Sequence, residues 1–489
     1  MTFGSRTTVH RSDVARVGVA VLGLILSTGV ARAQDAPPAP DVTTPEGPPG
    51  GPATAGPPPA WQDRFDELDR RTRVLESQKD QGASVRPDNA HPVAEGPISQ
   101  ADESGFTIVS RDRAYQVRLK GLLQVDGRAF IGDSTLSPLD TFVLRKIRPI
   151  LAGTLLGLTD FFFSPDFGNN AVVVADAFLD VHPFPWLRLR LGKFKEPYGL
   201  ERIQADQDLT FIERALDQGL TPQREIGVQL WGDIAGGLVR YEAGVYNGTA
   251  DNAITDIDNN ASKTFGGRIF VQPFNTEALR GLGRLGFGVA ASSGIEGGSA
   301  ASTSLGVFKS AGQNTVFSYL TSTSDTTLNV FAAGRHSRIN PQLYYYNGPF
   351  GLLGEWVKEH QGVQQGNATG AYNNSAGHIT ASIAFGGDVT YEGVKPKHAL
   401  DLAAGTFGAL EIGFRYNSLK VDGAAFPTGA DPAKSVQEAK GYGVALNWQL
   451  SRNLKASANY EQTRYTAGAA KGADRKTENV LIGRFQTAF

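Results

Sequence analysis

The chain from residue 105 to its C-terminus alternates apolar and polar residues with a period of two, in one segment after another. The clearest examples are residues 117–128, 239–245, 411–417, 444–450 and 454–461. Such alternation places apolar side chains on one face of a β-strand and polar side chains on the other. Because it persists over the whole region, it predicts an all-β fold with two unlike faces.

Two further features favour a closed barrel over a packed sandwich. Very short connections, such as residues 182–186 and 451–453, alternate with long Gly-, Ser-, Thr- and Asn-rich ones, which we place at residues 292–315 and 362–377. Outer-membrane barrels have short periplasmic turns and long external loops in this way. The polar face also carries charged residues in almost every strand, which a water-filled lumen tolerates and a packed sandwich core does not. We therefore predict an all-β transmembrane antiparallel β-barrel whose apolar face meets lipid and whose closure leaves no unpaired edge.

The region is long enough for about 16 strands at roughly 24 residues per strand and its share of loop, with 14 or 18 as the alternatives. In its last segment, Leu481, Phe485 and Phe489 share one face, and Arg484 and Gln486 share the other. A last strand that ends in Phe is typical of the assembly signal of bacterial outer-membrane barrels. We expect the barrel-assembly machinery to recognise the chain through Phe489.

The N-terminal part of the chain has a different composition. Arginines precede an apolar run at residues 17–30, and Ala31, Arg32 and Ala33 form a small-x-small cleavage site, so residues 1–33 are predicted to be a signal peptide cleaved after Ala33. The remaining boundaries that we predict are a Pro-rich linker at 34–60, a short coiled coil at 61–80, a second linker at 81–104 and a β-barrel domain at 105–489. A lone amphipathic helix is the alternative for residues 61–80.

Composition excludes several other classes of protein. The chain has no Cys, which rules out disulfides, thiol nucleophiles and Cys-ligated metals, and its formal net charge of −2 does not suggest a nucleic-acid partner. Its 7 His are scattered without metal-ligand spacing. Residues 281–286 match a dinucleotide-binding fingerprint, but they lead into an alternating strand and not into a helix. We predict no enzyme activity, no cofactor and no metal; an outer-membrane barrel enzyme and a soluble secreted β-protein are the competing classes.

One connection is unusually long. A strand that alternates Leu and Arg at residues 187–191 is separated from the next alternating strand, residues 226–230, by a loop of roughly thirty residues. Its bases are Lys193, Lys195, Arg202, Arg214 and Arg224, and its acids are Glu196, Glu201, Asp206, Asp208, Glu213, Asp217 and Glu225. A loop of this length in an all-β protein is more often functional than filler, although a solvated surface loop is the simpler alternative.

Several short motifs resemble one family when they are taken in order. They lie at residues 142–148, 175–179, 191–201, 213–214, 222–227, 244–248 and 484–489, and together they extend over essentially all of the predicted barrel. In sequence and spacing they are similar to the phosphate-selective porin O/P family of bacterial outer-membrane porins. The resemblance implies a homotrimer of 16-stranded barrels in outer-membrane lipid, each with its third external loop folded into the pore as a constriction. That loop would include Glu201, Arg202, Asp206, Gln207, Asp208, Glu213 and Arg214.

The resemblance also implies a lumen in which basic side chains guide anions. The side chains that we predict to line the pore are Arg118, Lys120, Arg128, Arg145, Lys146, Arg188, Arg190, Lys193, Lys195, Arg240, Arg268 and Arg415. On the strands that can be phased, inward bases, with Lys455 and Arg484 among them, slightly outnumber the inward acids Asp126, Asp176, Asp180, Glu242, Asp388, Glu411 and Glu461. This bias favours anions, unless each base is a wall residue neutralised by a neighbouring acid.

Two positions in the family pattern need comment. The family's paired arginines correspond to Arg145 and Lys146, and two neighbours on a regular strand face opposite ways, so both can reach the lumen only at a bulge or in a loop. Phosphate-binding members carry a lysine in the constriction loop where this chain has Gln207, flanked by Asp206 and Asp208. We expect a passive diffusion channel for small anions such as phosphate or polyphosphate, with weak to moderate anion preference and no high-affinity phosphate site. A general or weakly selective porin for other small polar solutes is the alternative.

Overall fold

The computed structural model describes residues 96–489, except 133–137, 255, 257, 259 and 275–283. The predicted signal peptide, first linker and coiled coil (1–33, 34–60 and 61–80) lie outside the described residues. Among the described residues, no helix is long and apolar enough to cross a membrane.

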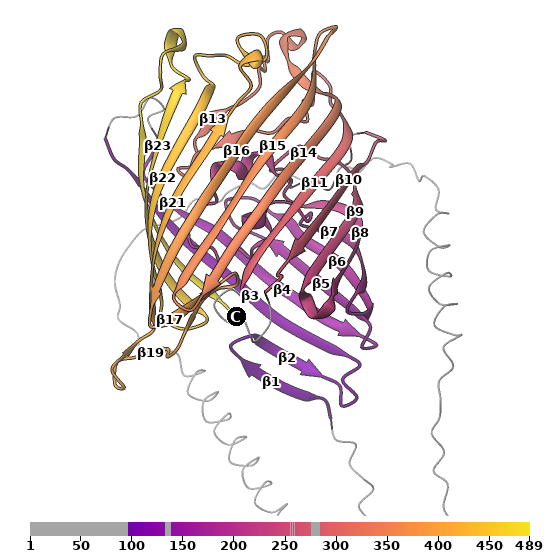
Figure 1. Ribbon diagram of the computed structural model, residues 1–489, viewed down its shortest axis with the longest axis vertical. Coiled ribbons are helices and arrows are strands. Elements are labelled where there is room, and N and C mark those ends of the chain that lie inside the picture. The colour runs from indigo at the N-terminus through magenta and orange to yellow at the C-terminus, as the bar shows by residue number, and fades with distance from the viewer. Residues whose placement is uncertain (1–95, 133–137, 255, 257, 259, 275–283) are drawn as a thin grey trace, which may run out of the picture. The chain divides into compact units, whose positions relative to one another are not determined.

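The chain forms a closed antiparallel β-barrel (Figure 1). Sixteen of the 18 strands of its main sheet, all except β1 and β2, form the wall, and the barrel closes where β24 pairs with β3. These strands are β3 (Gln116–Phe130), β4 (Thr141–Leu155), β5 (Thr159–Asp166), β6 (Val173–Phe184), β7 (Leu187–Phe194), β8 (Glu225–Ile234), β9 (Val239–Tyr246), β10 (Thr264–Val271), β11 (Leu285–Gly297), β14 (Val330–Asn347), β15 (Phe350–Gln365), β16 (Ala368–Phe385), β21 (Ala409–Lys420), β22 (Val436–Gln449), β23 (Leu454–Ala467) and β24 (Glu478–Ala488). The predicted fold and the preferred strand number are confirmed.

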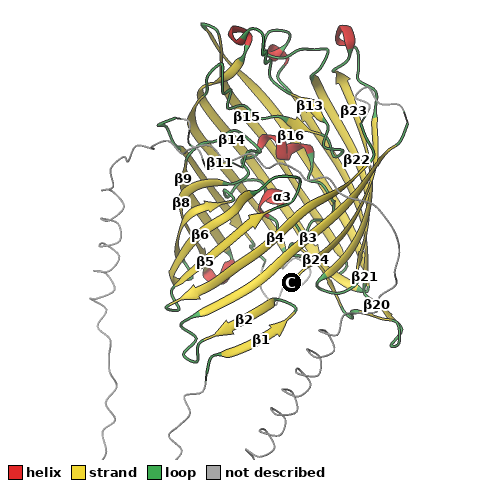
Figure 2. Ribbon diagram, turned by 180° about the vertical axis from the view of Figure 1, so that it is seen from behind, coloured by secondary structure: helices red, strands yellow, loops and turns green. Residues whose placement is uncertain are grey.

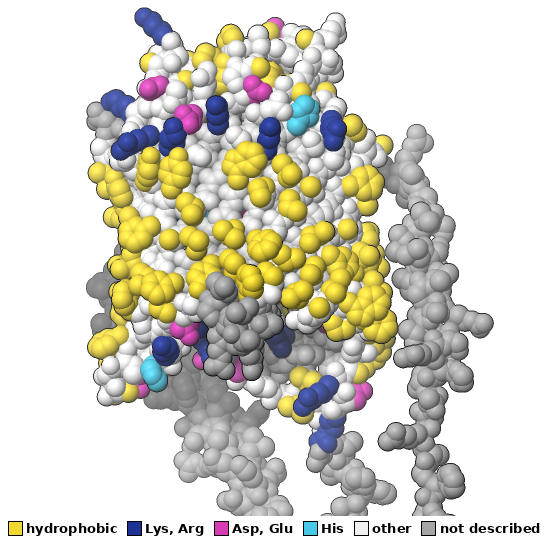
Figure 3. Space-filling model, viewed as in Figure 1, with side chains coloured by type: hydrophobic (Ala, Val, Ile, Leu, Met, Phe, Trp, Pro, Cys, Tyr) yellow, Lys and Arg dark blue, Asp and Glu magenta, His cyan; other side chains and the backbone are white. Residues whose placement is uncertain are grey.

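The outer surface of the barrel carries the apolar face of the alternating strands. Val117 and Leu119 of β3 and Val444 and Leu446 of β22 are each more than two-fifths exposed. Figure 3 shows that such side chains form a broad band around the middle of the visible face, with basic residues along its upper border. An apolar belt of this kind matches the hydrocarbon layer of a membrane, because lipid tails and not water cover it.

The sheet begins earlier than the sequence pattern predicts. β1 (Ile98–Asp102) and β2 (Gly105–Val109) form a hairpin, so residues 98–102 are strand although we assigned them to the linker at 81–104. β2 pairs with the first residues of β3, below the point where β24 pairs with the same edge. The hairpin therefore extends the sheet beyond the end of the barrel (Figure 2).

The two ends of the barrel differ in the length of their connections. At one end, β6 and β7 are joined by residues 185–186, β14 and β15 by 348–349, and β22 and β23 by 450–453. The opposite end carries loops 195–224, 247–263 and 298–329, and we take it as the external end because outer-membrane barrels place their longer loops outside. The smaller elements in the connections are α3 (Leu200–Ile203), η1 (Leu216–Leu220), η2 (Ala235–Gly237), β12 (Phe308–Lys309), β13 (Thr315–Phe317), η4 (Thr326–Leu328), β17 (Gly387–Thr390), β18 (Gly393–Pro396), β19 (Leu400–Asp401), β20 (Thr406–Phe407), η5 (Gly423–Ala425) and η6 (Ala470–Gly472).

The prediction of a long loop at residues 362–377 is wrong. β15 and β16 pair in register through this segment, with His360 opposite Asn373, and only Gly366 and Asn367 connect them. Gly and Asn have low strand propensity, but strand pairing on both sides overrides that weak preference. A long connection lies instead at the other end of β16, where residues 386–408 form two small hairpins.

Candidate functional site

The loop of residues 195–224, which we call the constriction loop, lies inside the barrel and is bound to its far wall (Figure 2). The carboxylate of Glu355 on β15 accepts hydrogen bonds from the backbone N–H groups of Leu200 and Glu201, at 2.6 and 2.9 Å. Further along the loop, the N–H of Ile212 donates to Asn459 on β23 at 2.6 Å. These bonds satisfy buried backbone donors that water would otherwise have to reach, and they fix the loop across the lumen.

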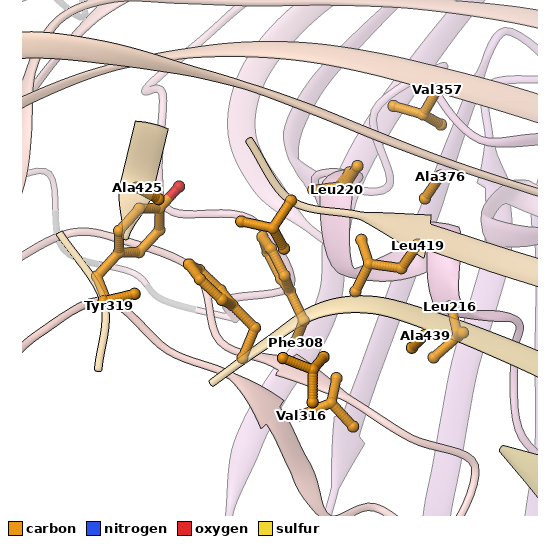
Figure 4. Packing of buried hydrophobic residues seen from close by; sticks show 14 of the residues in the cluster. Leu216, Leu220, Phe308, Val316, Tyr319, Val357, Ala376, Leu419, Ala425 and Ala439 are labelled. Atoms are coloured by element: carbon orange, nitrogen blue, oxygen red, sulfur yellow. The ribbon is translucent and has the colours of Figure 1, made fainter. Parts of the chain in front are cut away.

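Apolar packing fills one part of the lumen (Figure 4). Leu216 and Leu220 of the constriction loop pack in a cluster with Phe308 and Val316 of the loop between β11 and β14. The wall contributes Val357, Ala376, Leu419 and Ala439 to the same cluster. Close-packed apolar side chains leave no room for hydrated ions, so ions cannot pass through this part of the lumen.

Two cavities lie between the constriction loop and the wall. The external one has a volume of about 290 Å³, and the other, toward the end with short turns, about 350 Å³. They share four lining residues, which we call the shared ring: Arg148, Lys195, Asp206 and Arg224. The cavities therefore meet at this ring, where three of the four side chains are basic.

The acid of the shared ring is held by three cations. Asp206 accepts hydrogen bonds from Arg148 and Arg214 at 2.6 Å each and pairs with Lys146 at 2.7 Å. Burial would raise the pKa of Asp206, but the charges of Lys146, Arg214 and Arg148 keep it well below its usual range. The negative charge of Asp206 is thus compensated by these cations.

A β-bulge brings Arg145 and Lys146 into the lumen together. In the pairing of β3 with β4, Gln124 lies opposite Lys146 and Val125 opposite Leu144, so Arg145 is an extra residue in the ladder. Both side chains consequently reach the constriction loop, Arg145 to Glu213 at 2.9 Å and Lys146 to Asp206. A residue inserted into one strand of a pair re-aims the side chains beside it, so that two neighbours can lie on the same face of the sheet.

Glu213 is the second acid of the constriction loop that is held by several cations. Its carboxylate pairs with Arg128 at 2.6 Å and with Arg145 at 2.9 Å. Burial opposes ionisation of Glu213, but the two guanidinium groups, Arg145 first, lower its pKa to about 2. Glu213 therefore stays ionised at any pH that the barrel meets, and it keeps Arg145 at the edge of the external cavity.

The lining of the external cavity is strongly basic. It includes eight basic residues, namely Arg145, Lys146, Arg148, Lys195, Arg202, Arg214, Arg224 and Lys309, against three acids, Asp166, Asp206 and Glu213. The other cavity is closer to neutral, with Lys120, Arg148, Arg190, Lys195 and Arg224 against Asp176, Glu196, Asp206 and Glu242. An excess of basic over acidic side chains at the external approach raises the local concentration of anions.

Three predicted arginines surround one tryptophan at the inner end of the lumen. The guanidinium groups of Arg188, Arg190 and Arg240 lie 4.3, 5.2 and 5.3 Å from the ring centre of Trp231. Asp180 holds this group by accepting hydrogen bonds from Arg188, Arg190 and the indole N–H, at 2.8 to 3.0 Å. Basic side chains thus occur along the lumen from the external cavity to the inner end.

Several residues that we predicted to line the pore have other surroundings. Lys193 faces outward, opposite Ala177 and Ile226, and pairs with Asp256 at 2.6 Å. Its strand alternation places it on the outer face, although we grouped it with the loop. Arg415 is buried between the wall and the constriction loop, where it bonds both oxygens of Glu461 at 2.8 and 2.9 Å and the backbone carbonyl of Glu213 at 2.9 Å.

Arg268 is likewise a wall residue, paired with Glu242 at 3.1 Å. Arg118 and Lys120 face inward on β3, and Lys120 lines the inner cavity. Asp388, which we counted on a barrel strand, lies in β17 of the connection between β16 and β21.

The remaining predicted loop residues mostly stabilise the loop itself. Glu201 accepts a hydrogen bond from the N–H of Ala215 at 2.9 Å, and Arg202 donates to Thr221 at 3.1 Å. Gln207 differs from them, because it lines the inner cavity. Its backbone carbonyl accepts hydrogen bonds from Lys455 at 2.8 Å and from Gln486 at 2.9 Å.

Four charged residues that line the external cavity were missing from the residues predicted to line the pore or its constriction: Arg148, Asp166, Arg224 and Lys309. Arg148 could have been found, because it follows Lys146 by two residues and therefore shares its face of the strand. Asp166 is its partner on β5, at 2.7 Å. Lys309 lies in a loop, and the alternation of residues that predicts strands does not predict the path of a loop.

Several known proteins are similar to this chain. Among solved structures, the chain is similar to the outer-membrane channel DcaP of Acinetobacter baumannii, with 11% identity, a TM-score of 0.49 and coverage of 79% of this chain and 100% of that one. It is also similar to the outer-membrane protein OmpT of Vibrio cholerae, with 13% identity, a TM-score of 0.47 and coverage of 77% and 98%. A search of curated proteins gives no match. The sequence profile described as phosphate-selective porin O and P matches residues 117–489. The chain belongs to the phosphate-selective porin O and P family.

Proposed function

We propose that this outer-membrane porin is a passive diffusion channel that prefers small anions. The observation that carries the proposal is the lining of the external cavity, where eight bases face three acids just before the shared ring. Field lines are focused in a narrow, low-dielectric passage, so such an excess favours anions over cations of the same size. The family and the barrel wall support a channel in place of an enzyme.

The proposed path passes from one cation to the next. An anion enters past Lys309 and Arg145, passes the shared ring, and leaves toward Lys120 and Arg190. Most of these cations already donate to carboxylates, so an anion must compete for their hydrogen bonds. Weak binding at several sites allows exit as well as entry, which a conducting pore requires.

Phosphate would pass by the same path without a high-affinity site. A doubly charged anion needs several charge-assisted hydrogen bonds to replace its water. At the shared ring those donors are shared with Asp206 and Asp176, since Arg224 pairs with Asp176 at 3.1 Å. Planar-bilayer recording tests the proposal: we expect a reversal potential in a KCl gradient of the sign for anion preference, and phosphate block only at millimolar concentration. A cation-selective reversal potential would overturn it.

Gln207→Lys should create the missing phosphate site. Residue 207 lines the inner cavity next to the shared ring, so a lysine there would add a cation to that cavity. We expect the phosphate concentration for half-block to fall about tenfold, the effect of one added charge-assisted hydrogen bond. Gln207→Met is the control of similar size and should leave the block unchanged. Equal block in both variants would show that residue 207 lies away from the path.

The pKa of Asp208 leads us to expect that the selectivity depends on pH. Burial raises the pKa of this carboxyl to about 7, an effect that Glu392 adds to and Lys455 opposes. Asp208 is therefore neutral below about pH 7 and negative above it, so the anion preference should fall as the pH rises from 5.5 to 8.5. The measurement is the chloride-to-potassium permeability ratio from reversal potentials. Asp208→Asn should reduce the change, and an unaltered pH profile in that variant would exclude Asp208 as its source.

We also propose a homotrimer recognised by the barrel-assembly machinery through Phe489. Barrels of this size commonly associate through apolar walls in closed symmetry. Phe489 exchanges two backbone hydrogen bonds with Gly121, at 2.9 and 3.0 Å, and its ring meets Phe106 edge-on. The terminal residue thus completes the seam of the barrel, where a chain that lacked it would close less firmly.

A further inference from the structure

A groove crosses the outer wall of the barrel over β9, β10, β11, β14 and β15. Its volume is about 960 Å³. Its floor consists of small residues in register, with Ala243 opposite Gly267 and Gly267 opposite Ala291. The exposed side chains of Phe265 and Ile269 stand on either side of this row. The groove lies within the apolar band that meets lipid, so its natural occupant has an apolar chain.

Unpaired cations lie at the external border of the same wall. Arg335 on β14 and Lys358 on β15 are exposed and line the groove, and Lys420 on β21 is exposed beside them. Lys358 lies opposite Ser375, which lies opposite Lys420, so the two lysines are two strands, or about 10 Å, apart. Within the described part of the chain, none of the three makes an ion pair. Figure 3 shows basic side chains along this border of the apolar band.

The arrangement requires a ligand with two parts. Three cations without protein partners at the boundary between lipid and water need anionic groups, and phosphate oxygens accept charge-assisted hydrogen bonds from both Arg and Lys. Basic pockets at the head-group level of membrane proteins bind anionic lipid head groups for this reason. The groove directly below Arg335 and Lys358 offers the space for an acyl chain.

We propose that this groove binds a phosphorylated glycolipid of the outer leaflet. One acyl chain lies over the floor of Ala243, Gly267 and Ala291, and the phosphates lie against Arg335, Lys358 and Lys420. Charge complementarity selects this occupant over an uncharged lipid. The apolar space of the groove selects a lipid over free phosphate, because free phosphate would contact the cations alone. The competing occupant is a second copy of the chain.

The test is native mass spectrometry of the full barrel in detergent, titrated with lipid A that carries two phosphates or none. We expect the parent to retain the phosphorylated lipid and the variant Arg335→Gln, Lys358→Gln, Lys420→Gln to bind it at least about tenfold more weakly. The dephosphorylated lipid should bind weakly, and it should bind the parent and the triple variant equally. Ala291→Phe, which fills the floor, should weaken binding of the phosphorylated lipid with all three cations in place. Millimolar inorganic phosphate should not displace the lipid from the parent.

The matched control neutralises three exposed cations elsewhere, Lys397, Lys434 and Arg452, and should bind as the parent does. Heat-modifiable gel migration verifies that each variant is a folded barrel. Equal lipid retention in the parent and the triple variant would overturn the proposal. The chain has no Cys, so Ser293→Cys gives a unique thiol in the groove. A disulfide between two copies in membranes would assign the groove to a subunit interface and would also overturn it.

Discussion

Glu355→Ala is expected to release the constriction loop and to raise single-channel conductance severalfold. The Glu355 carboxylate accepts from the N–H groups of Leu200 and Glu201, and also from Gln218 at 3.2 Å and Asn340 at 3.1 Å. Removing the carboxylate costs about 1–3 kcal/mol for each buried donor that it leaves unpaired. The sixteen-stranded wall keeps its own ladder of hydrogen bonds, so the loss falls on the loop.

Single-channel recording in a planar bilayer measures this effect, together with current noise, which a mobile loop should increase. Glu296→Ala is the matched control, because Glu296 is an equally buried glutamate on β11 that bonds His336 and not the constriction loop. It should leave the conductance near the parent value even where it lowers the thermal stability. Equal conductance in the parent and Glu355→Ala, with heat-modifiable migration intact, would show that the other wall contacts hold the loop without Glu355.

Residue alternation predicts the barrel well because each strand has only two faces. The outward positions of β3 and β22 follow from the sequence alone. The expectation that the neighbours Arg145 and Lys146 both reach the lumen even indicates the bulge that the ladder contains. Alternation fails where pairing overrides composition, as in residues 362–377, and where loops cover the wall. Val357 and Leu419 face inward although they are apolar, because the constriction loop and its neighbour pack on them.

The charge of the pore could not be predicted by counting residues of the constriction loop. The loop has more acids than bases in sequence, but Asp206 and Glu213 are each held by two or more cations from the wall or the loop. Only contacts between residues far apart in sequence decide which charges stay available. Arg128 and Glu213, for example, are 85 residues apart. Sequence therefore identified many of the basic positions, but not which of them face open space.

Neutralising the external approach is the second change with a large expected effect. In the variant Arg145→Gln, Lys146→Gln, Lys309→Gln, the lining of the external cavity falls from eight bases and three acids to five bases and three acids, so its formal charge drops from +5 to +2. Each charge contributes on the order of 1 kcal/mol at a few ångströms in a water-filled passage, less at high salt. We expect the chloride-to-potassium permeability ratio to fall about threefold to tenfold, with the larger change at low salt.

Reversal potentials at 0.1 M and 1 M KCl, each with the same gradient, measure both the effect and its screening. Glu213 keeps Arg128 as a partner, and Asp206 keeps Arg148 and Arg214, so the constriction loop should hold its place and conductance in symmetric salt should change little. The variant that neutralises Arg335, Lys358 and Lys420 is the matched control, since it removes the same charge from the outer wall and should leave the permeability ratio at the parent value. If both triple variants shift the ratio equally, long-range surface charge and not the cavity lining sets the selectivity, and the assignment of the path along Arg145 and Lys146 is wrong.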